Sequence, residues 1–506
     1  MKIFLANPTY RFDIGGGKEK YFVRAGSRWP FSTVKKVKEK PEYIPFPFFL
    51  AYTAAVLQKK GYQVIVDDGV AVNETEEQLL NKVKKEKPQI LLFEITTPTV
   101  DYDLDLVKKI KRNSPKTIIC LAGTHASVFP GEILKKSPAV DYIFLGEYEL
   151  TFADFVGNLS KKKSLKNLNG IAFRNNRQII INDSKAIDPL DNLPFPARDL
   201  FPSNDNPNPS LYWDGFCQYK PSVQMHASRG CPFRCNFCLW NQVIYKNGKY
   251  RFFSAQRVVD EMEDVVGRFS AKEIYFDDDT FTADKKQVLR ICNEINKRDL
   301  RVYWSAMGDA MITDEEMVKA MAKAGCIGIK FGVESGSKEI LKKIGKPIDF
   351  EKVKKFASWC AGSKIKTHAT FTFGLTGETK ESMNQTLDFA KGLDVDSVQF
   401  SLTTPFPGTR YFNQLKKENR LVSQNWKDFD GSSLSVVRLG NISQSYLAEF
   451  CRKASGRWLM AKIKNPAWII RQVSNFKRQL EGQNINFVFK RLKRGIRLLY
   501  DGIKIY

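Results

Sequence analysis

The chain has 506 residues, a formal net charge of +25, and a hydrophobic fraction of 43%. This length predicts two or three domains, and the hydrophobic fraction is typical of a folded, soluble protein. No run of eighteen apolar residues occurs, so no membrane-spanning helix is predicted. Nine cysteines, mostly scattered, predict a reducing cytoplasm rather than a disulfide framework. The excess of positive charge predicts an anionic partner without specifying its class.

Residues 1–160 alternate strand and helix patterns, beginning with a strand and polar turn at Met1–Pro8 rather than a signal peptide. Short apolar runs separated by helical segments predict a doubly wound parallel sheet. The expected strands are Lys2–Ala6, Gln63–Val66, Ile90–Phe93, Thr117–Leu121 and Tyr142–Leu145. Ligands of such sheets bind beyond the carboxyl ends of the strands. The residues expected there are Asn7, Thr9, Thr96, Thr97, Gly123, Thr124, His125, Gly146 and Glu147.

Residues 161–222 are predicted to form a connector. Gly170–Phe173 and Gln178–Ile181 predict a small hairpin. Six prolines between Pro189 and Pro209 then predict an extended crossing segment.

Strand and helix patterns alternate again over residues 223–430. Six βα units predict a partial barrel, whose functional residues gather at the carboxyl ends of its strands. The expected strands are Val223–Ser228, Glu273–Phe276, Arg301–Ser305, Ile327–Val333, Thr367–Phe373 and Ser397–Ser401.

The loop after the first of these strands contains Cys231, Cys235 and Cys238 at C-x3-C-x2-C spacing. Three soft thiolates this close favour an iron–sulfur cluster or zinc. Structural zinc needs four protein ligands, and only His226 and Cys217, upstream, are candidates for the fourth. A cluster held by three cysteines leaves one iron open for a small-molecule ligand.

The motif C-x3-C-x-aromatic-C, with Phe237 as the aromatic residue, resembles the signature of radical S-adenosylmethionine (SAM) enzymes. The resemblance implies a 4Fe-4S cluster whose open iron binds SAM and whose electron cleaves it to a 5′-deoxyadenosyl radical. It extends in motif order from Cys231 to Gly408. These motif sequences are most similar to those of the hopanoid-biosynthesis and magnesium-protoporphyrin ester cyclase branches, which carry a cobalamin-binding domain.

The resemblance also implies cofactor contacts at the other strand ends. Asp277, Asp278 and Asp279 would accept hydrogen bonds from the methionine ammonium of SAM, although they depart from the family's Gly-Gly-Glu-like sequence. The alternative for these aspartates is a helix N-cap. Further expected SAM contacts are Glu334 and Ser335 to the ribose and Gly374 and Gly377 to the adenine.

Residues 1–160 resemble the cobalamin-binding domain of this family, through Asn-Pro, Ala-Gly-Thr-His and Leu-Gly-Glu-Tyr-Glu in order. The Asp-x-His-x-x-Gly loop that carries a lower axial histidine is missing after the first strand. His125 is therefore expected to be either a loop histidine bonded to its neighbours or a ligand contact. Cobalamin without a protein ligand on cobalt, or a sheet kept for scaffolding, are the two alternatives for this domain.

Residues 431–506 are predicted to be helical and basic. Fourteen Lys or Arg oppose Glu481 and Asp501 within 452–506, a net charge of 14 − 2 = +12. Apolar residues at helical spacing predict either an amphipathic surface on an anionic membrane or helices packed on the barrel. Contact with a nucleic acid is the third alternative for this region. The apolar positions are Ile469, Val473, Phe476, Leu480, Ile485, Phe489, Leu492, Ile496, Leu499 and Ile503, with Lys490, Arg491, Lys493, Arg494 and Arg497 opposite.

Together these features predict a cytoplasmic radical SAM enzyme, with cobalamin, for methylation, rearrangement or cyclisation at an unactivated carbon. The substrate is expected to be a small or lipid-like molecule, and the electron donor a flavodoxin or ferredoxin. A position on the inner face of the cell membrane follows if the basic tail binds lipid. The alternatives are a tRNA-modifying radical enzyme and a non-catalytic cobalamin or iron–sulfur sensor.

Overall fold

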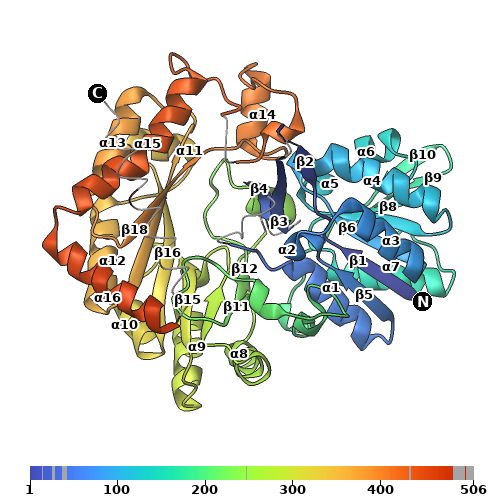
Figure 1. The fold of residues 1–506 in the computed structure, drawn as a ribbon, viewed down its shortest axis with the longest axis horizontal. Coiled ribbons are helices and arrows are strands. Elements are labelled where there is room, and N and C mark those ends of the chain that lie inside the picture. The colour runs from blue at the N-terminus through green and yellow to red at the C-terminus, as the bar shows by residue number, and fades with distance from the viewer. Residues whose placement is uncertain are drawn as a thin grey trace.

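The computed structural model describes the chain except residues 14, 17, 26–28, 37–42, 247, 432–434, 483–495 and 497–506. Two α/β halves lie side by side, the N-terminal half in blue and cyan and the C-terminal half in yellow to red (Figure 1). The predicted α/β fold class is confirmed, with a doubly wound sheet followed by a partial barrel.

The N-terminal half is built on a seven-stranded sheet in the order β10-β9-β8-β7-β6-β1-β5. Apolar runs form its parallel strands because helices cover both faces, and β6 is buried along its whole length. The chain passes from β1 to β5 on one side and then to β6 on the other, which makes a switch point between β1 and β6. The parallel strands are β1 (Lys2–Ala6), β5 (Gln63–Asp67), β6 (Ile90–Glu94), β7 (Ile118–Ala122) and β8 (Tyr142–Phe144). The helices are α1 (Phe48–Lys59), α2 (Gly69–Val72), α3 (Glu76–Glu86), α4 (Val100–Asn113), α5 (Thr124–Val128), α6 (Pro130–Lys136) and α7 (Glu149–Ser160).

The hairpin predicted in the connector is β9 (Ile171–Asn175) and β10 (Gln178–Ile181). The hairpin was predicted as part of a separate connector, but β9 pairs antiparallel with β8, so the hairpin extends the first sheet. Phe173 lies opposite Tyr142 and packs on its ring.

A three-stranded antiparallel sheet of β2 (Arg11–Asp13), β3 (Glu19–Ala25) and β4 (Trp29–Lys36) was not predicted. It lies between the two halves (Figure 1). Arg24 of β3 is fully buried and donates to both carboxylate oxygens of Asp103 on α4, at 2.7 and 2.8 Å. A buried cation with a bidentate carboxylate partner ties this small sheet to the first domain.

The C-terminal half contains six parallel strands in the order β11-β14-β15-β16-β17-β18, and their number and order agree with the predicted partial barrel. Several of its helices begin at a side chain that accepts from a first-turn amide, as Asp314 does from the Met317 amide. The strands are β11 (Ser222–Met225), β14 (Glu273–Phe276), β15 (Tyr303–Gly308), β16 (Cys326–Glu334), β17 (Lys366–Phe373) and β18 (Ser397–Leu402). The helices are α8 (Ala255–Phe269), α9 (Lys285–Lys297), α10 (Glu315–Lys323), α11 (Lys338–Ile344), α12 (Phe350–Gly362), α13 (Lys380–Gly392) and α14 (Arg410–Lys417).

Two helices follow the barrel, α15 (Gln444–Lys462) and α16 (Pro466–Gly482). The indole of Trp458 on α15 donates to the Ala390 carbonyl at 3.0 Å, so α15 is seated on the barrel. The predicted positions between residues 485 and 503 lie outside the described residues, except Ile496, which is exposed. In the part of the chain that the structure describes, no helix has the length and apolar character needed to cross a membrane.

Candidate active site

The carboxyl ends of β1 and β5 carry a buried polar network. The Asn7 amide donates to the Arg24 carbonyl at 3.1 Å and to Asp68 at 2.9 Å. The Tyr212 hydroxyl donates to the other oxygen of Asp68, whose pKa is raised to about 7 by burial. Asn7, predicted to contact cobalamin, is therefore bonded within the protein on its amide nitrogen. The Thr9 hydroxyl is buried and makes no hydrogen bond with the described residues.

The carboxyl ends of β6 and β7 form the neighbouring part of this edge. Gly123 has a φ of +108°, and a Cβ there would lie 2.3 Å from the Ile95 carbonyl oxygen, so only glycine fits. The Thr124 hydroxyl is buried and makes no hydrogen bond with the described residues. Orphaned hydroxyls on a doubly wound switch-point edge fit a ligand rich in amide groups, such as cobalamin.

His125 is buried rather than facing an open site. Its Nδ1 lies 3.2 Å from the Thr97 hydroxyl, and its ring meets Trp426 edge to face. Burial lowers the pKa of His125 to about 4, so the ring is neutral at physiological pH. Of the two alternatives, the side chain bonded to its neighbours agrees with these contacts. Thr96, also predicted at this edge, is buried beside the Thr99 hydroxyl at 2.9 Å.

Glu147, predicted as a cobalamin contact, is instead part of a buried ion-pair cluster. It lies 2.8 Å from Arg229 and 2.8 Å from Arg251, and Glu149 lies 2.6 Å from Arg229. All four side chains are at most 6% exposed. The two carboxylates follow β8 of the first sheet, whereas the two arginines face each other across β12 (Ser228–Arg229) and β13 (Arg251–Phe252) beside the cysteine loop. We call these four residues the carboxylate–arginine clamp.

Gly146 lies where the first sheet approaches the cysteine loop. A Cβ on it would come within 3.0 Å of the Ile244 carbonyl oxygen. Ile244 ends a π-helix, η5 (Trp240–Ile244), which follows the three cysteines directly. The helix α5 also contacts η5, and Val128 at its end packs in one apolar cluster with Leu239 and Phe406. The predicted edges of the two cofactor sites therefore adjoin.

Side-chain amides of η5 hold the cysteine loop. The Gln242 amide donates to the carbonyls of Cys235, Asn236 and Cys238 at 3.3, 3.0 and 2.7 Å. Asn241 donates to the carbonyls of Cys231 and Phe233 at 2.9 and 2.5 Å. Sequence analysis missed both residues, although π-helical turns are frequent at functional sites.

The three thiols lie in a protected setting that suits coordination. Cys235 is 8% exposed, and Cys231 accepts from the Thr280 hydroxyl at 3.1 Å. Burial raises the pKa of Cys235 and Cys238, so both thiols are protonated unless a metal coordinates them. Phe237 of the motif packs beside the cluster of Leu341 and Leu375.

The side chains proposed as a fourth zinc ligand have other surroundings. His226 stacks on Phe48 at 3.7 Å between ring centroids, and Cys217 belongs to an apolar cluster with Phe216 and Tyr275. Among the described residues, no three His, Cys, Asp or Glu side chains converge on the position of a single metal ion.

The aspartates after β14 support the cysteine loop. Asp278 accepts from the Ala227 amide at 2.8 Å and from the Ser228 hydroxyl at 2.5 Å. Asp279 accepts from the Gly230 amide at 2.9 Å. These bonds differ from the predicted contact with the SAM ammonium. The N-cap of the following helix α9 is Asp284, which accepts from the Gln287 amide. Asp277 is also buried.

Glu334 stands at the end of β16 with a strained backbone. Its φ of +72° is unusual for a residue with a Cβ, and the strand register shifts there. Thr372 donates to its carboxylate at 3.0 Å, and burial raises its pKa. Ser335, predicted beside it as a ribose contact, is fully buried, and its hydroxyl lies 3.1 Å from the Thr386 hydroxyl.

The glutamate of the Gly-Leu-Thr-Gly-Glu loop after β17 accepts hydrogen bonds from backbone amides of the same loop. Glu378 accepts from the Gly374 and Leu375 amides at 2.5 and 3.3 Å, and burial raises its pKa to about 8. Gly374 and Gly377 both have positive φ, of 95° and 76°. At Gly377 a Cβ would strike the Lys343 side chain.

Lys346 is a buried cation that sequence analysis did not single out. Its ammonium donates to Asp309 at 2.7 Å and lies 4.9 Å above the Phe233 ring of the cysteine loop. Burial alone would lower the pKa of Lys346, but the Coulomb attraction of Asp309 and Glu334 outweighs burial and raises it. Lys346 follows Gly345 at the end of α11. In the sequence alone, a lysine at this position indicates a solvated helix end.

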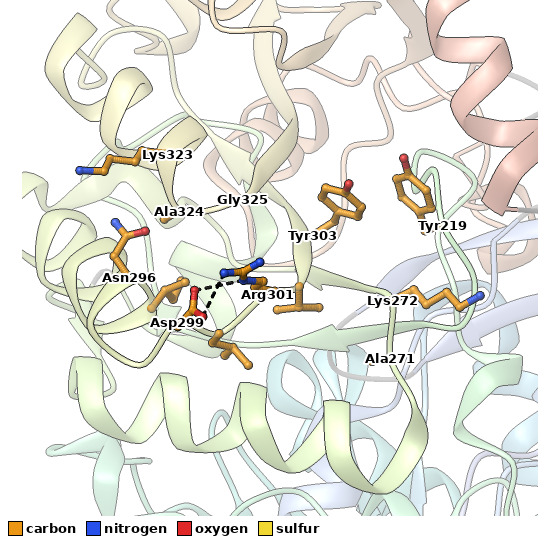
Figure 2. A pocket seen from close by; sticks show the side chains of 13 residues that line it. Tyr219, Ala271, Lys272, Asn296, Asp299, Arg301, Tyr303, Lys323, Ala324 and Gly325 are labelled. Atoms are coloured by element: carbon orange, nitrogen blue, oxygen red, sulfur yellow. Dashed lines mark hydrogen bonds and ion pairs between the residues drawn. The ribbon is translucent and has the colours of Figure 1, made fainter.

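A cavity of about 730 Å³ is lined in part by residues that come just before strands β14, β15 and β16 (Figure 2). Among its lining residues, the rings of Tyr219 and Tyr303 stack with their centroids 4.6 Å apart, and Asp299 pairs with Arg301. Its residues begin strands rather than follow them, so it is separate from the candidate active site.

Comparison with known proteins agrees with this arrangement. A model described as the radical SAM superfamily matches residues 225–390, and one described as a B12 binding domain matches residues 34–156. An uncharacterized methyltransferase of Pyrococcus horikoshii is 30% identical, over 90% of this chain and 94% of that protein. The anaerobic magnesium-protoporphyrin IX monomethyl ester cyclase of Rubrivivax gelatinosus is 27% identical, over 82% and 70%. The solved structure of the cobalamin-dependent SAM radical enzyme OxsB shares the fold, with a TM-score of 0.67, 16% identity, and coverage of 94% and 72%.

A doubly wound sheet whose ligand edge adjoins the cysteine loop of a partial barrel defines an enzyme that pairs a radical SAM centre with a second cofactor. The chain belongs to the cobalamin-binding-domain radical SAM enzymes. Its cofactors are a 4Fe-4S cluster, SAM and cobalamin, as predicted. These findings support the radical enzyme and not the RNA-modifying or sensor alternatives.

Proposed function

We propose that this enzyme transfers a methyl group to an unactivated carbon of a small-molecule or lipid-like substrate. The observation that carries the proposal is the contact of α5, after β7 of the first sheet, with η5, after the three cysteines. If cobalamin and the cluster bind at these two edges, a methyl carrier and a radical source would lie close to each other, as transfer between them requires. The methyltransferase of Pyrococcus horikoshii, which aligns with most of the chain, favours methyl transfer over cyclisation.

Cys231, Cys235 and Cys238 would hold the cluster, which supplies one electron to break a carbon–sulfur bond of SAM. Gln242 and Asn241 fix the loop that presents these thiolates. Bound cobalamin would supply a cobalt centre that carries methyl groups, and the residues after β1, β6 and β7 would hold it.

Residues at the barrel rim would bind and orient SAM. Lys346 would face its carboxylate, and Glu334 would accept from the ribose hydroxyls. Gly374 lets the backbone approach the adenine closely, because it has no side chain. Lys346, Glu334 and the cysteine loop already lie together, which supports these roles.

Isotope-labelled SAM tests the choice between methyl transfer and cyclisation. Methyl donation converts SAM to S-adenosylhomocysteine, whereas radical generation converts it to methionine and 5′-deoxyadenosine. With reductant present, protein loaded with the cluster should form 5′-deoxyadenosine with or without cobalamin, and S-adenosylhomocysteine only with cobalamin. If S-adenosylhomocysteine never forms and only 5′-deoxyadenosine accumulates, methyl transfer is refuted.

The electron donor is proposed to be a small acidic carrier such as a flavodoxin or ferredoxin. Arg234 of the cysteine loop, Lys342 of α11 and Arg410 of α14 are exposed around the loop, and Arg410 donates to the Arg234 carbonyl. Positive charge over a buried redox centre favours an acidic partner. Charge reversal of Lys342 to Glu should slow reduction by such a carrier and leave reduction by dithionite unchanged; equal rates in both assays would refute this surface.

A cytoplasmic location is part of the same proposal. All nine cysteines are free thiols in the structure, which agrees with a reducing compartment.

A further inference from the structure

The helix α16 is attached to the barrel through its polar side. Arg471 pairs with Asp394 at 3.1 Å, and Gln472 and Asn475 donate to Asp396 at 3.3 and 3.1 Å. The Trp468 indole, on the same side, donates to the Val395 carbonyl at 3.1 Å. An amphipathic helix normally buries its apolar side instead.

The apolar side of α16 is turned away from the barrel. Ile469, Ile470, Val473 and Leu480 are 42%, 70%, 63% and 41% exposed, and Ile463 just before the helix is 43% exposed. At 100° per residue the four helix positions fall on one side, opposite Asn475. A continuous aliphatic surface on one helix is a binding face rather than scattered exposure.

Positive charge lies on and near this surface. Lys477 is exposed one turn after Val473 on the same side of the helix, and Lys464 is exposed two residues before the helix begins. The sequence that follows, residues 483–506, adds six Lys or Arg against Asp501 and continues the apolar spacing. Aliphatic side chains with cations among and near them match the boundary between acyl chains and anionic headgroups, because a long lysine side chain can reach the headgroups from an inserted helix face. An apolar protein partner would be matched by the aliphatic residues alone and would leave these cations unused.

We propose that α16 is a membrane-docking face, which seats the enzyme on an anionic lipid surface with the barrel held above it. The aliphatic side inserts at the headgroup boundary, and the bonds of Arg471, Gln472 and Asn475 fix the helix to the barrel. The face thus binds lipid without unfolding any part of the catalytic domain. It is independent of the reaction that the enzyme catalyses.

Vesicle flotation of the full-length protein tests the proposal. Wild-type protein should float with vesicles of equal parts phosphatidylcholine and phosphatidylglycerol, and not with phosphatidylcholine alone. Binding should weaken as salt rises, because salt screens the headgroup charge. The double variant Ile470→Gln/Val473→Gln should reduce partitioning by about tenfold or more, since it removes the inserted side chains.

The matched control is Ile181→Gln on β10, which changes an aliphatic residue of 50% exposure in the first domain. It should float like the wild type. Circular dichroism should show that all variants fold. Failure of the wild type to float, or equal flotation of the double variant, overturns the proposal. A dimer in sedimentation that the double variant dissociates, without vesicle binding, would instead assign the face to a second copy of the chain.

Discussion

Replacing Arg229 by Met removes the central cation of the carboxylate–arginine clamp. In the wild type this guanidinium is fully buried, bonds to Glu147 and Glu149, and lies 4.8 Å from the centre of the Phe49 ring. Methionine fills a similar volume against the ring, so the change acts mainly on charge. Glu147 keeps Arg251 as a partner, whereas Glu149 is left without a cation.

Removing one partner of a buried ion pair destabilises a protein by about 3–5 kcal/mol. We expect a loss of this size for Arg229→Met near neutral pH, measured by urea unfolding of the cofactor-free protein. Burial already raises the pKa of Glu149, and loss of Arg229 should raise it further. A raised carboxyl pKa means that stability falls as pH rises above the unfolded pKa, so the loss should be smaller in acid.

The double variant Arg229→Met/Glu149→Leu separates charge from packing. Replacing both charges of a buried pair by apolar groups is often nearly neutral, so this variant should recover most of the lost stability. Lys60→Met is the control, because Lys60 pairs with Asp154 at an exposed site and should change the unfolding midpoint little. The reasoning fails if Arg229→Met resembles Lys60→Met, or if the double variant is no more stable than Arg229→Met.

Three further predictions concern single side chains. Glu378→Gln keeps the hydrogen bonds from the amides of its loop and removes a carboxyl group whose pKa burial raises to about 8. The wild type should therefore lose stability relative to this variant as pH rises from about 4.5 to 8. Thermal melts should show this difference, with Glu339→Gln at an exposed site as the control. Gln242→Leu frees three carbonyls of the cysteine loop and should speed iron loss to a chelator about 10- to 100-fold; an unchanged rate would contradict the role of η5. Gly123→Ala places a Cβ against the Ile95 carbonyl, so the variant should lose about 1–3 kcal/mol and retain less cobalamin on gel filtration, and normal retention would remove Gly123 from the site.

The strands of both sheets could be predicted because burial on two faces makes them contiguous apolar runs. Ile90–Glu94 is such a strand. The small sheet β2–β4 could not be predicted, because the sequence around Arg24 indicates a surface cation. Its buried partner, Asp103 on α4, lies 79 residues further along the chain. Strand β15 continues to Gly308, beyond the predicted end at Ser305, because Ala306 and Met307 pair with β16.

The spacing of Cys231, Cys235 and Cys238 narrowed the centre to an iron–sulfur cluster or zinc, and the resemblance of the whole motif to radical SAM enzymes then implied the cluster. Polar residues at strand ends were less informative. The position of Glu147 at a strand end predicts where its side chain lies, but it does not predict the ion pair with Arg229. Pairings between the two domains depend on their packing, which no local pattern records.

Reductive cleavage of SAM by the Cys235→Ala variant tests the central assignment most directly. Anaerobically reconstituted wild-type protein with dithionite should release 5′-deoxyadenosine, and so should Cys451→Ala, which changes a thiol of α15 outside the loop. The Cys235→Ala protein should release none, because two thiolates cannot hold a cluster with one open iron. If 5′-deoxyadenosine forms in the Cys235→Ala protein at the wild-type rate, the cluster is not held by this loop and the account of the active site is wrong.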